Sequence, residues 1–404
     1  MNRKQLTLIL IAVVVFGGLG LWLRNRDVSS FKTSQGSMGQ KVLGEFDLNT
    51  VARVTVKQGT NELQLVQQND QWTVAQRAGY PANFSEVGEF LRKLWDLKTI
   101  QPVRIGPSQL GRLELVPGAG TNTATVVELK DKDGKAIRTV LLGKKHMKQG
   151  GSPSPFGGDE GWPDGRFVMV DGKPETTSLV SESFSNIEPK PEQWLNKDFF
   201  KVEKVKSIAV TYPVATNSWK LVRESETAEW KLVDAKPEEP LDAAKTSGLA
   251  NALSWPSFND VVVDPKPEAT GLDKPTLAVV ETFDGFTYTV KVGNKSGEEA
   301  YYMALSVAAD LPKERTPGKD EKPEDKEKLD KEFKEKADKQ KEKLKQEQAL
   351  EKWTFLASKW TFDSLLKERH TLFVDKKAEG AKPADGAAPL VPDLNPVPAI
   401  LPKP

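Results

Sequence analysis

Two short motifs contain residue types that could carry out serine acyl transfer. Ser29 and Lys32 have the Ser-x-x-Lys spacing, in which a lysine one helical turn away activates the serine as a nucleophile. Residues 245–248 read Lys-Thr-Ser-Gly, which is similar to the Lys-Thr-Gly element of the same chemistry. That chemistry needs the serine at a buried helix start, but Ser29 lies in a polar, Ser-rich stretch. The motifs therefore do not predict an active site.

The composition argues against thiol, metal and nucleic-acid chemistry. The 404-residue chain has no cysteine, and its two histidines, His146 and His370, are far apart in sequence, so neither sulfur ligands nor a histidine pair is available to a metal. A site of two carboxylates and one histidine stays open. The 58 basic and 57 acidic residues leave a formal net charge of +1, so no overall field attracts nucleic acid. We expect no catalytic, cofactor-binding or metal-binding residues, and a protein that is not an enzyme.

The tryptophans divide into predicted core residues and predicted contact residues. Five fall on expected strands or helices, where a large aromatic side chain anchors a core. These are Trp72, Trp95, Trp219, Trp230 and Trp255. Trp162, in the Gly- and Pro-rich loop over 150–165, and Trp194, after a Pro-rich stretch, are predicted to be exposed partner contacts.

Residues 6–23 form a run of 18 uncharged, mostly apolar residues near the N-terminus. As a helix this run is about 27 Å long, close to the thickness of the hydrocarbon core of a bilayer. A cleaved signal peptide is the alternative, but the apolar run continues up to Arg24 with no small-residue cleavage site. We expect a retained transmembrane anchor over 1–24.

The charges around this run indicate its direction. Arg3 and Lys4 precede it, and this bias favours an N-terminus inside the cell. We expect a tether over 25–43, followed by domains on the outer side of the inner (cytoplasmic) membrane.

The chain after the tether repeats the same patterns twice in the same order. The matching segments are 46–56 with 200–210, the strand pair closed by Trp72 with that closed by Trp230, 139–145 with 289–295 (which pairs Gly143 with Gly293), and 167–170 with 301–304. The strands alternate apolar and polar residues, as in an antiparallel sheet with one wet face. The sequence predicts an α+β fold of two tandem copies, over 44–197 and 198–375, each an antiparallel sheet plus an amphipathic helix.

Each copy contains one apolar pattern with helical spacing. Val87, Phe90, Leu91 and Leu94 follow it in the first copy, after Asn83 as a capping residue. Residues 241–253 follow it in the second copy. These patterns predict the helix that covers each sheet.

Residues 313–352 are an insertion in the second copy, with 14 basic and 13 acidic side chains in 40 positions. Glu or Asp to Lys pairs at i, i+4 predict a helix of up to about 30 residues. Leu329 and Phe333 give this helix a thin apolar edge, too sparse for a sustained coiled-coil seam. It is either a solvated protrusion or a partner-docking arm. Residues 376–404 are rich in Pro and Ala and are predicted to be disordered.

An apolar anchor, the pattern Phe-x-Leu-x-x-Val-x-x-Val-x-Val at 46–56, a Trp-terminated strand pair, an amphipathic helix and a Leu-Gly-Lys strand before Phe-Val-Met-Val at 167–170 resemble the bacterial family catalogued as domain of unknown function 4340. The resemblance covers about 44–310 and 353–375. Members are often encoded beside gliding-motility-type ABC transporter components, which implies an extracytoplasmic accessory role. The family supplies no catalytic residues, and the charged insertion and Pro-rich tail depart from its pattern.

Three functions remain, in this order. The first is a single-pass, membrane-anchored scaffold or partner-binding protein that serves an ABC-type transport complex. The second is a cell-envelope protein that binds a glycan or peptide in the groove between the copies, and the third is an envelope hydrolase. A deep pocket with converging polar groups would favour the second or third, and an exposed apolar surface would favour the first.

Overall fold

The computed structural model describes residues 38–120, 122–148, 162–237, 239–318 and 321–374. The predicted anchor, most of the tether, the Ser29/Lys32 pair and the predicted disordered tail lie outside these residues. Within the described ranges, no helix is both long and apolar enough to cross a lipid bilayer.

The first domain is built on a nine-stranded sheet in which every neighbouring pair is antiparallel. Its order is β4-β3-β2-β1-β6-β7-β8-β9-β5. The strands are β1 (Arg53–Gln58), β2 (Asn61–Gln68), β3 (Gln71–Val74), β4 (Tyr80–Pro81), β5 (Thr99–Pro102), β6 (Thr125–Lys130), β7 (Ala136–Lys148), β8 (Trp162–Val170) and β9 (Ser178–Val180). The predicted α+β class with antiparallel sheets is confirmed.

The second domain has an eight-stranded sheet of order β12-β11-β10-β14-β15-β16-β17-β13, also antiparallel throughout. Its strands are β10 (Val205–Thr211), β11 (Trp219–Val222), β12 (Lys231–Leu232), β13 (Phe258–Val262), β14 (Thr276–Thr282), β15 (Phe286–Ser296), β16 (Ala300–Ala309) and β17 (Thr354–Ser358). Apart from the two-residue β4, the two sheets have the same strand order.

The strand registers show which residues are equivalent in the two sheets. Val140 lies opposite Val127, and Val290 lies opposite Ala278, which places Gly143 and Gly293 at the same position of β7 and β15. Val74 lies opposite Leu65, and Leu232 lies opposite the equivalent residue Leu221. Trp72 and Trp230, each two residues earlier, are therefore also equivalent. The predicted pairings of these glycines and tryptophans are therefore correct.

The predicted pairing of 167–170 with 301–304 is wrong by one residue. Leu142 lies opposite Val168, and its equivalent Val292 lies opposite Met303, so Val168 corresponds to Met303 and not to Tyr302. Val168 and Met303 are both fully buried. Because strand side chains alternate between faces, a slip of one residue exchanges the buried and the exposed set.

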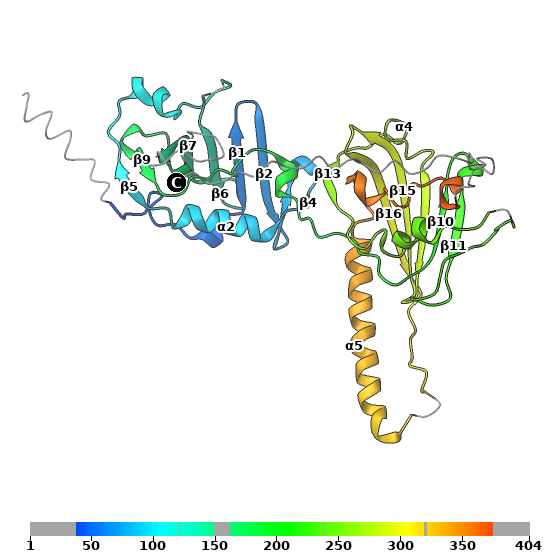
Figure 1. The fold of residues 1–404 in the computed structure, drawn as a ribbon. Coiled ribbons are helices and arrows are strands. Elements are labelled where there is room, and N and C mark those ends of the chain that lie inside the picture. The colour runs from blue at the N-terminus through cyan, green and yellow to red at the C-terminus, as the bar shows by residue number, and fades with distance from the viewer. Residues whose placement is uncertain (1–37, 121, 149–161, 238, 319–320, 375–404) are drawn as a thin grey trace, which may run out of the picture.

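The helices of the two domains differ more than the sequence indicates. Helix α2 (Phe84–Trp95) is capped by the Asn83 side chain and buries Val87, Phe90, Leu91 and Leu94 against the first sheet, as predicted (Figure 1). In the second domain the expected helix is only α3 (Ala243–Thr246) followed by the 3-10 turn η7 (Ser247–Asn251). Gly248 lies inside this pattern, and glycine costs about 1 kcal/mol in a helix interior. The other α-helices of the described residues are α4 (Pro267–Thr270) and α5 (Pro323–Gln348).

A backbone contact explains both equivalent glycines. The carbonyl oxygen of Leu113 lies 2.3 Å from the point where a Cβ on Gly143 would lie, and that of Thr270 lies 2.1 Å from the corresponding point on Gly293. Leu113 ends the 3-10 segment η3 (Pro107–Leu113), and Thr270 ends α4. The segment before β6 thus packs its backbone directly onto β7, and the segment before β14 packs onto β15 in the same way, at a place where only glycine fits.

We predict that Gly143→Ala and Gly293→Ala each lower the free energy of unfolding by about 1–3 kcal/mol, because the new methyl group forces the packed backbone to move. The measurement is denaturant unfolding followed by tryptophan fluorescence. Gly88→Ala is the control, since Gly88 lies in α2 with nothing near its missing Cβ. It should be neutral or stabilising, and equal losses at all three positions would contradict the explanation.

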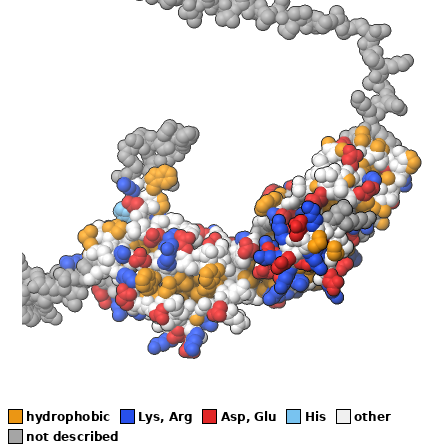
Figure 2. Space-filling view, turned by 90° about the horizontal axis from the view of Figure 1, so that it is seen from below, with side chains coloured by type: hydrophobic (Ala, Val, Ile, Leu, Met, Phe, Trp, Pro, Cys, Tyr) orange, Lys and Arg blue, Asp and Glu red, His pale blue; other side chains and the backbone are white. Residues whose placement is uncertain are grey.

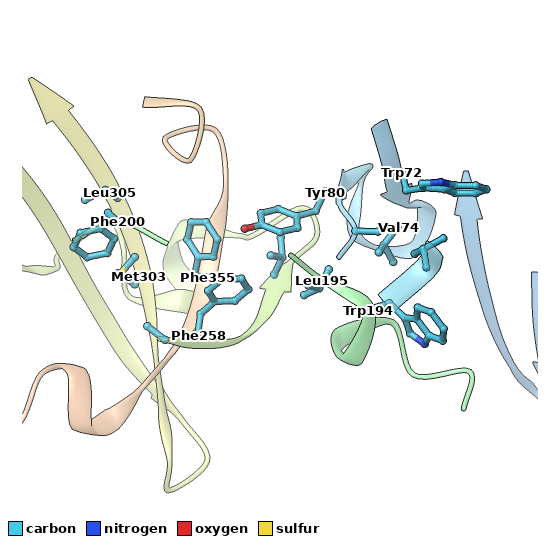
Figure 3. Packing of buried hydrophobic residues seen from close by; sticks show 14 of the residues in the cluster. Trp72, Val74, Tyr80, Trp194, Leu195, Phe200, Phe258, Met303, Leu305 and Phe355 are labelled. Atoms are coloured by element: carbon cyan, nitrogen blue, oxygen red, sulfur yellow. The ribbon is translucent and has the colours of Figure 1, made fainter. Parts of the chain in front are cut away.

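The two domains share one hydrophobic core, which is continuous through Tyr80 (Figure 3). Tyr80, 2% exposed, belongs to β4 of the first domain, and its ring packs edge-on against Phe258, Trp353 and Phe355 of the second, at centroid distances of 5.2–6.1 Å. Beside it Arg77 donates from Nε and Nη2 to both carboxylate oxygens of Asp260, at 2.6 and 2.7 Å. This contact holds the domains as one body.

We predict that Tyr80→Ala destabilises the protein by about 3–5 kcal/mol, because it leaves a cavity among the rings of both domains. It should also separate one unfolding transition into two, which differential scanning calorimetry would record. Tyr80→Phe keeps the ring and is the control. A single, unshifted transition in the alanine variant would show that the aromatic contact does not couple the domains.

Candidate functional site

An apolar cleft of about 740 Å³ opens on the first domain. Its floor is formed by outward-facing residues of the sheet, and its wall by the segment that follows η3. The apolar lining residues are Leu110, Leu115, Val116, Pro117, Ala124, Val126, Leu141 and Met169. Leu141 alternates with Val140 and Leu142, which face the main core on the α2 side, so this cleft lies on the opposite face of the sheet.

The charged groups at this cleft pair with one another or with backbone. Lys57 lies 4.0 Å from Glu128, both at the rim. The carboxylate of Asp171 accepts the backbone N–H of Thr139 at 3.1 Å. The polar groups therefore do not converge on the apolar floor, and the cleft suits an apolar side chain better than a polar small molecule.

None of the predicted site residues lies in this cleft. Its signal was present in β7 and β8, where Val140-Leu141-Leu142 and Val168-Met169-Val170 are apolar without alternation. Such runs indicate strands covered on both faces. The second cover is the short segment around Leu115, which has no periodicity of its own.

The predicted contact tryptophans lie in opposite environments. Trp162 begins β8 and is 81% exposed. Trp194 is 4% exposed and packs its ring against Phe90 of α2 at 5.6 Å, so the expectation of an exposed contact there is wrong. The preceding Pro-rich stretch folds back as the 3-10 turn η5 (Pro191–Trp194) and inserts the ring into the core. Trp255, expected in the core, is 73% exposed, with the Lys201 ammonium 4.4 Å from its ring.

Helix α5 confirms the predicted charged helix and projects from the second domain (Figure 1). Most of its 26 residues are exposed, and Leu329 and Phe333 are half-buried. Seen from below, where α5 points towards the viewer, basic and acidic side chains are intermixed on this part of the surface (Figure 2). Arg315, in the segment that leads from β16 to α5, bonds to Glu321 and to Asp330 of α5 at 2.7 Å.

The root of the arm is fixed by Glu347, a buried carboxylate. It accepts hydrogen bonds from the backbone N–H of Lys201 at 3.0 Å and the hydroxyl of Tyr288 at 2.9 Å, and Lys343 lies 3.8 Å away. Burial raises the pKa of the Glu347 carboxyl, although these bonds oppose the rise. Leu344 packs on the core beside it. The arm is therefore anchored at one end only.

The lysine of the Lys-Thr-Ser-Gly stretch has a structural contact. The Lys245 ammonium donates to the backbone carbonyl of Phe373 at 2.8 Å, and the buried Thr246 hydroxyl bonds within its helix. Among the described residues, no group of three or more histidine or acidic side chains is placed to hold a metal ion. His146 pairs with Asp164 at 2.6 Å.

The model of one protein family, described as a domain of unknown function (DUF4340), matches residues 72–275. The chain belongs to the DUF4340 family. The match runs from β3 to the residue before β14, and so includes Tyr80, Asp260 and most of the apolar cleft. No curated protein and no solved structure matches the chain.

The raised pKa of Glu347 predicts a pH dependence of stability. The folded state binds the Glu347 proton more tightly than the unfolded chain does. The stability that this proton contributes is therefore complete below the ordinary glutamate pKa of about 4.3, and it is lost as pH rises through the pKa of the folded state. The melting temperature of the wild type relative to Glu347→Gln should therefore fall as pH increases from about 4. The control is Glu342→Gln, an exposed position of the same helix. If the melting temperature of the wild type instead rises relative to that of Glu347→Gln as pH increases, the pKa of Glu347 is not raised in the folded state.

Proposed function

We propose that this protein is a single-pass, membrane-anchored, extracytoplasmic partner-binding protein, and that its partner is an ABC-type transport complex. The observation that carries the proposal is the arm α5, which is held rigidly at its root and projects from a two-domain body. The apolar run over 6–23 supports the anchor, and the family resemblance supports the choice of partner.

The equivalent strands and glycines support the origin of this body as two copies of one unit. The first copy has no arm: β8 and β9 are joined by a short connection through the 3-10 turn η4 (Pro174–Thr176), where β16 and β17 are separated by the insertion. The sheet therefore closes without such a helix. The fold does not need the arm, yet buried hydrogen bonds hold the arm in one direction. Such a segment is suited to contact another protein.

The distal part of the arm offers both elements of a protein contact. Leu329 and Phe333 supply apolar area, and the mixed charges around them supply specificity, since the rim of a protein interface is polar. With 14 basic and 13 acidic residues over 313–352, the arm suits a partner surface of mixed charge.

Ligand binding is the second candidate, favoured by the apolar cleft. Its place is the outer face of the first sheet and not a groove between the copies. A peptide with one or two apolar side chains would fit its floor better than a glycan, because the polar groups at its rim are paired to each other or to backbone. An envelope hydrolase stays the third candidate function.

We predict that replacing residues 313–334 with a short Gly/Ser linker abolishes co-purification with ABC transporter subunits from detergent-solubilised membranes. The melting temperature should change by only a few degrees, because the bonds of Lys336 to Asp284 and of Glu347 to Lys201 are retained. Quantitative mass spectrometry of the transporter permease and ATP-binding subunits gives the readout.

A point variant tests the apolar edge itself. Leu329→Ser/Phe333→Ser should reduce co-purification strongly, whereas the control Lys326→Ala/Glu327→Ala, which removes two exposed charges nearby, should have a small effect. Unchanged recovery of the transporter subunits with the shortened arm would reject the arm as their docking element.

A further inference from the structure

A second cleft on the first domain, of about 600 Å³, is lined by basic side chains. Arg104 follows β5, Arg112 lies in η3, and Lys144, Lys145 and His146 lie on β7. Phe167 and Met147 form part of the apolar wall, and no acidic side chain is among the lining residues. The chain as a whole is nearly neutral, so this concentration of positive charge is local.

A backbone irregularity allows two consecutive lysines to line the same cleft. Neighbouring residues of a regular strand point to opposite faces. The register between β7 and β8 shifts between Leu142 and Lys145, next to Gly143, and bulges of this kind redirect side chains. Arg166 of β8 fixes the distortion, because its Nε donates to the carbonyl of Gly143 at 2.8 Å.

Three of these cations have no acidic partner in the part of the chain that the structure describes. Among the described residues, no carboxylate forms an ion pair with Arg112, Lys144 or Lys145, although His146 pairs with Asp164. Like charges gathered around one concave surface repel each other and focus a positive potential into it. A bound anion would relieve this repulsion.

The second domain shows that the fold does not require the charges. Its β15 has the same register shift after the equivalent Gly293, and its edge strand β13 has the same irregularity as β5. The equivalent positions there hold Val263 for Arg104, Ala269 for Arg112, Asn294 for Lys144 and Ser296 for His146. Only Lys145 has a basic counterpart, Lys295, which lies over the Tyr301 ring at 5.6 Å. The same backbone irregularity therefore carries five basic residues in the first copy and only one basic counterpart of them, Lys295, in the second.

We propose that this cleft of the first domain binds a phosphate group, with Arg112, Lys144 and Lys145 as its principal partners. Arginine presents a planar fork of N–H donors to phosphate oxygens, and the lysines add point charges. Phe167 and Met147 would contact the apolar or sugar body that carries the phosphate. The same chemistry is offered by an anionic phospholipid headgroup and by a soluble phosphate ester. This site is separate from the arm and does not depend on the function proposed above.

The test uses the full chain in neutral detergent and follows the rate at which an amine-reactive reagent acetylates individual lysines, quantified by mass spectrometry. One sample receives sodium pyrophosphate at constant ionic strength, one receives mixed micelles with phosphatidylglycerol, and the reference receives phosphatidylcholine. Lys144 and Lys145 should be protected, while Lys132 and Lys135, exposed on the hairpin between β6 and β7, serve as internal controls. Protection with the lipid alone assigns a headgroup, protection with pyrophosphate alone assigns a soluble ester, and protection with both supports either source.

Variants that copy the second domain give an independent measurement. Arg112→Ala/Lys144→Asn should weaken the binding of the effective probe about tenfold or more, because charge-assisted hydrogen bonds are the strong ones at such sites. Lys132→Ala/Lys135→Ala removes the same formal charge elsewhere and should bind as the wild type does. Equal acetylation of all four lysines in every sample, or equal loss of binding in both double variants, would overturn the proposal.

Discussion

The insertion of Tyr80 into the aromatic cluster of the second domain is the contact on which the arrangement of the whole body depends. The ring comes from a two-residue strand of the first sheet and is covered by Phe258 and Phe355, which lie on the edge strand and its neighbour in the second. The Lys197 ammonium adds a hydrogen bond to the carbonyl of Asn259 at 2.8 Å across the same junction. Because these contacts bury apolar rings and pair nearby charges, neither domain can rotate without exposing a shared core.

The same backbone design serves two different surfaces. In each domain a strand glycine accepts the close approach of a preceding segment, and the register shifts immediately after it. This feature is set by backbone sterics, so the side chains that follow are free to differ. The first copy places Lys144 and Lys145 there, and the second places Asn294 and Lys295. A repeated fold thus supplies positions, and the chemistry of each copy is determined by residues that the fold leaves unconstrained.

The sequence predicts this fold best where one local pattern determines the result. The sequence predicts that Gly143 and Gly293 are equivalent because only glycine fits the close backbone contact at that position. It predicts α2 because the apolar spacing and the Asn83 cap indicate the same helix. The predicted pairing of 167–170 with 301–304 is wrong by one residue because aromatic and apolar residues fill both faces of β16. The alternation of polar and apolar residues that would set the register is therefore absent. The burial of Trp194 depends on Phe90, more than 100 residues earlier, and no local pattern encodes that contact. Both clefts are likewise made by segments that meet only in the folded chain.

Glu347 illustrates why a costly contact can be kept at the root of the arm. A buried carboxylate adds little net stability, since its desolvation offsets the bonds that it forms. Its partners, however, come from different parts of the chain: the backbone of Lys201 before β10 and the hydroxyl of Tyr288 in β15. These bonds are satisfied together only when α5 leaves the sheet in one direction, and any other direction leaves a buried charge without partners. The contact therefore specifies the direction of the arm more than it stabilises the domain.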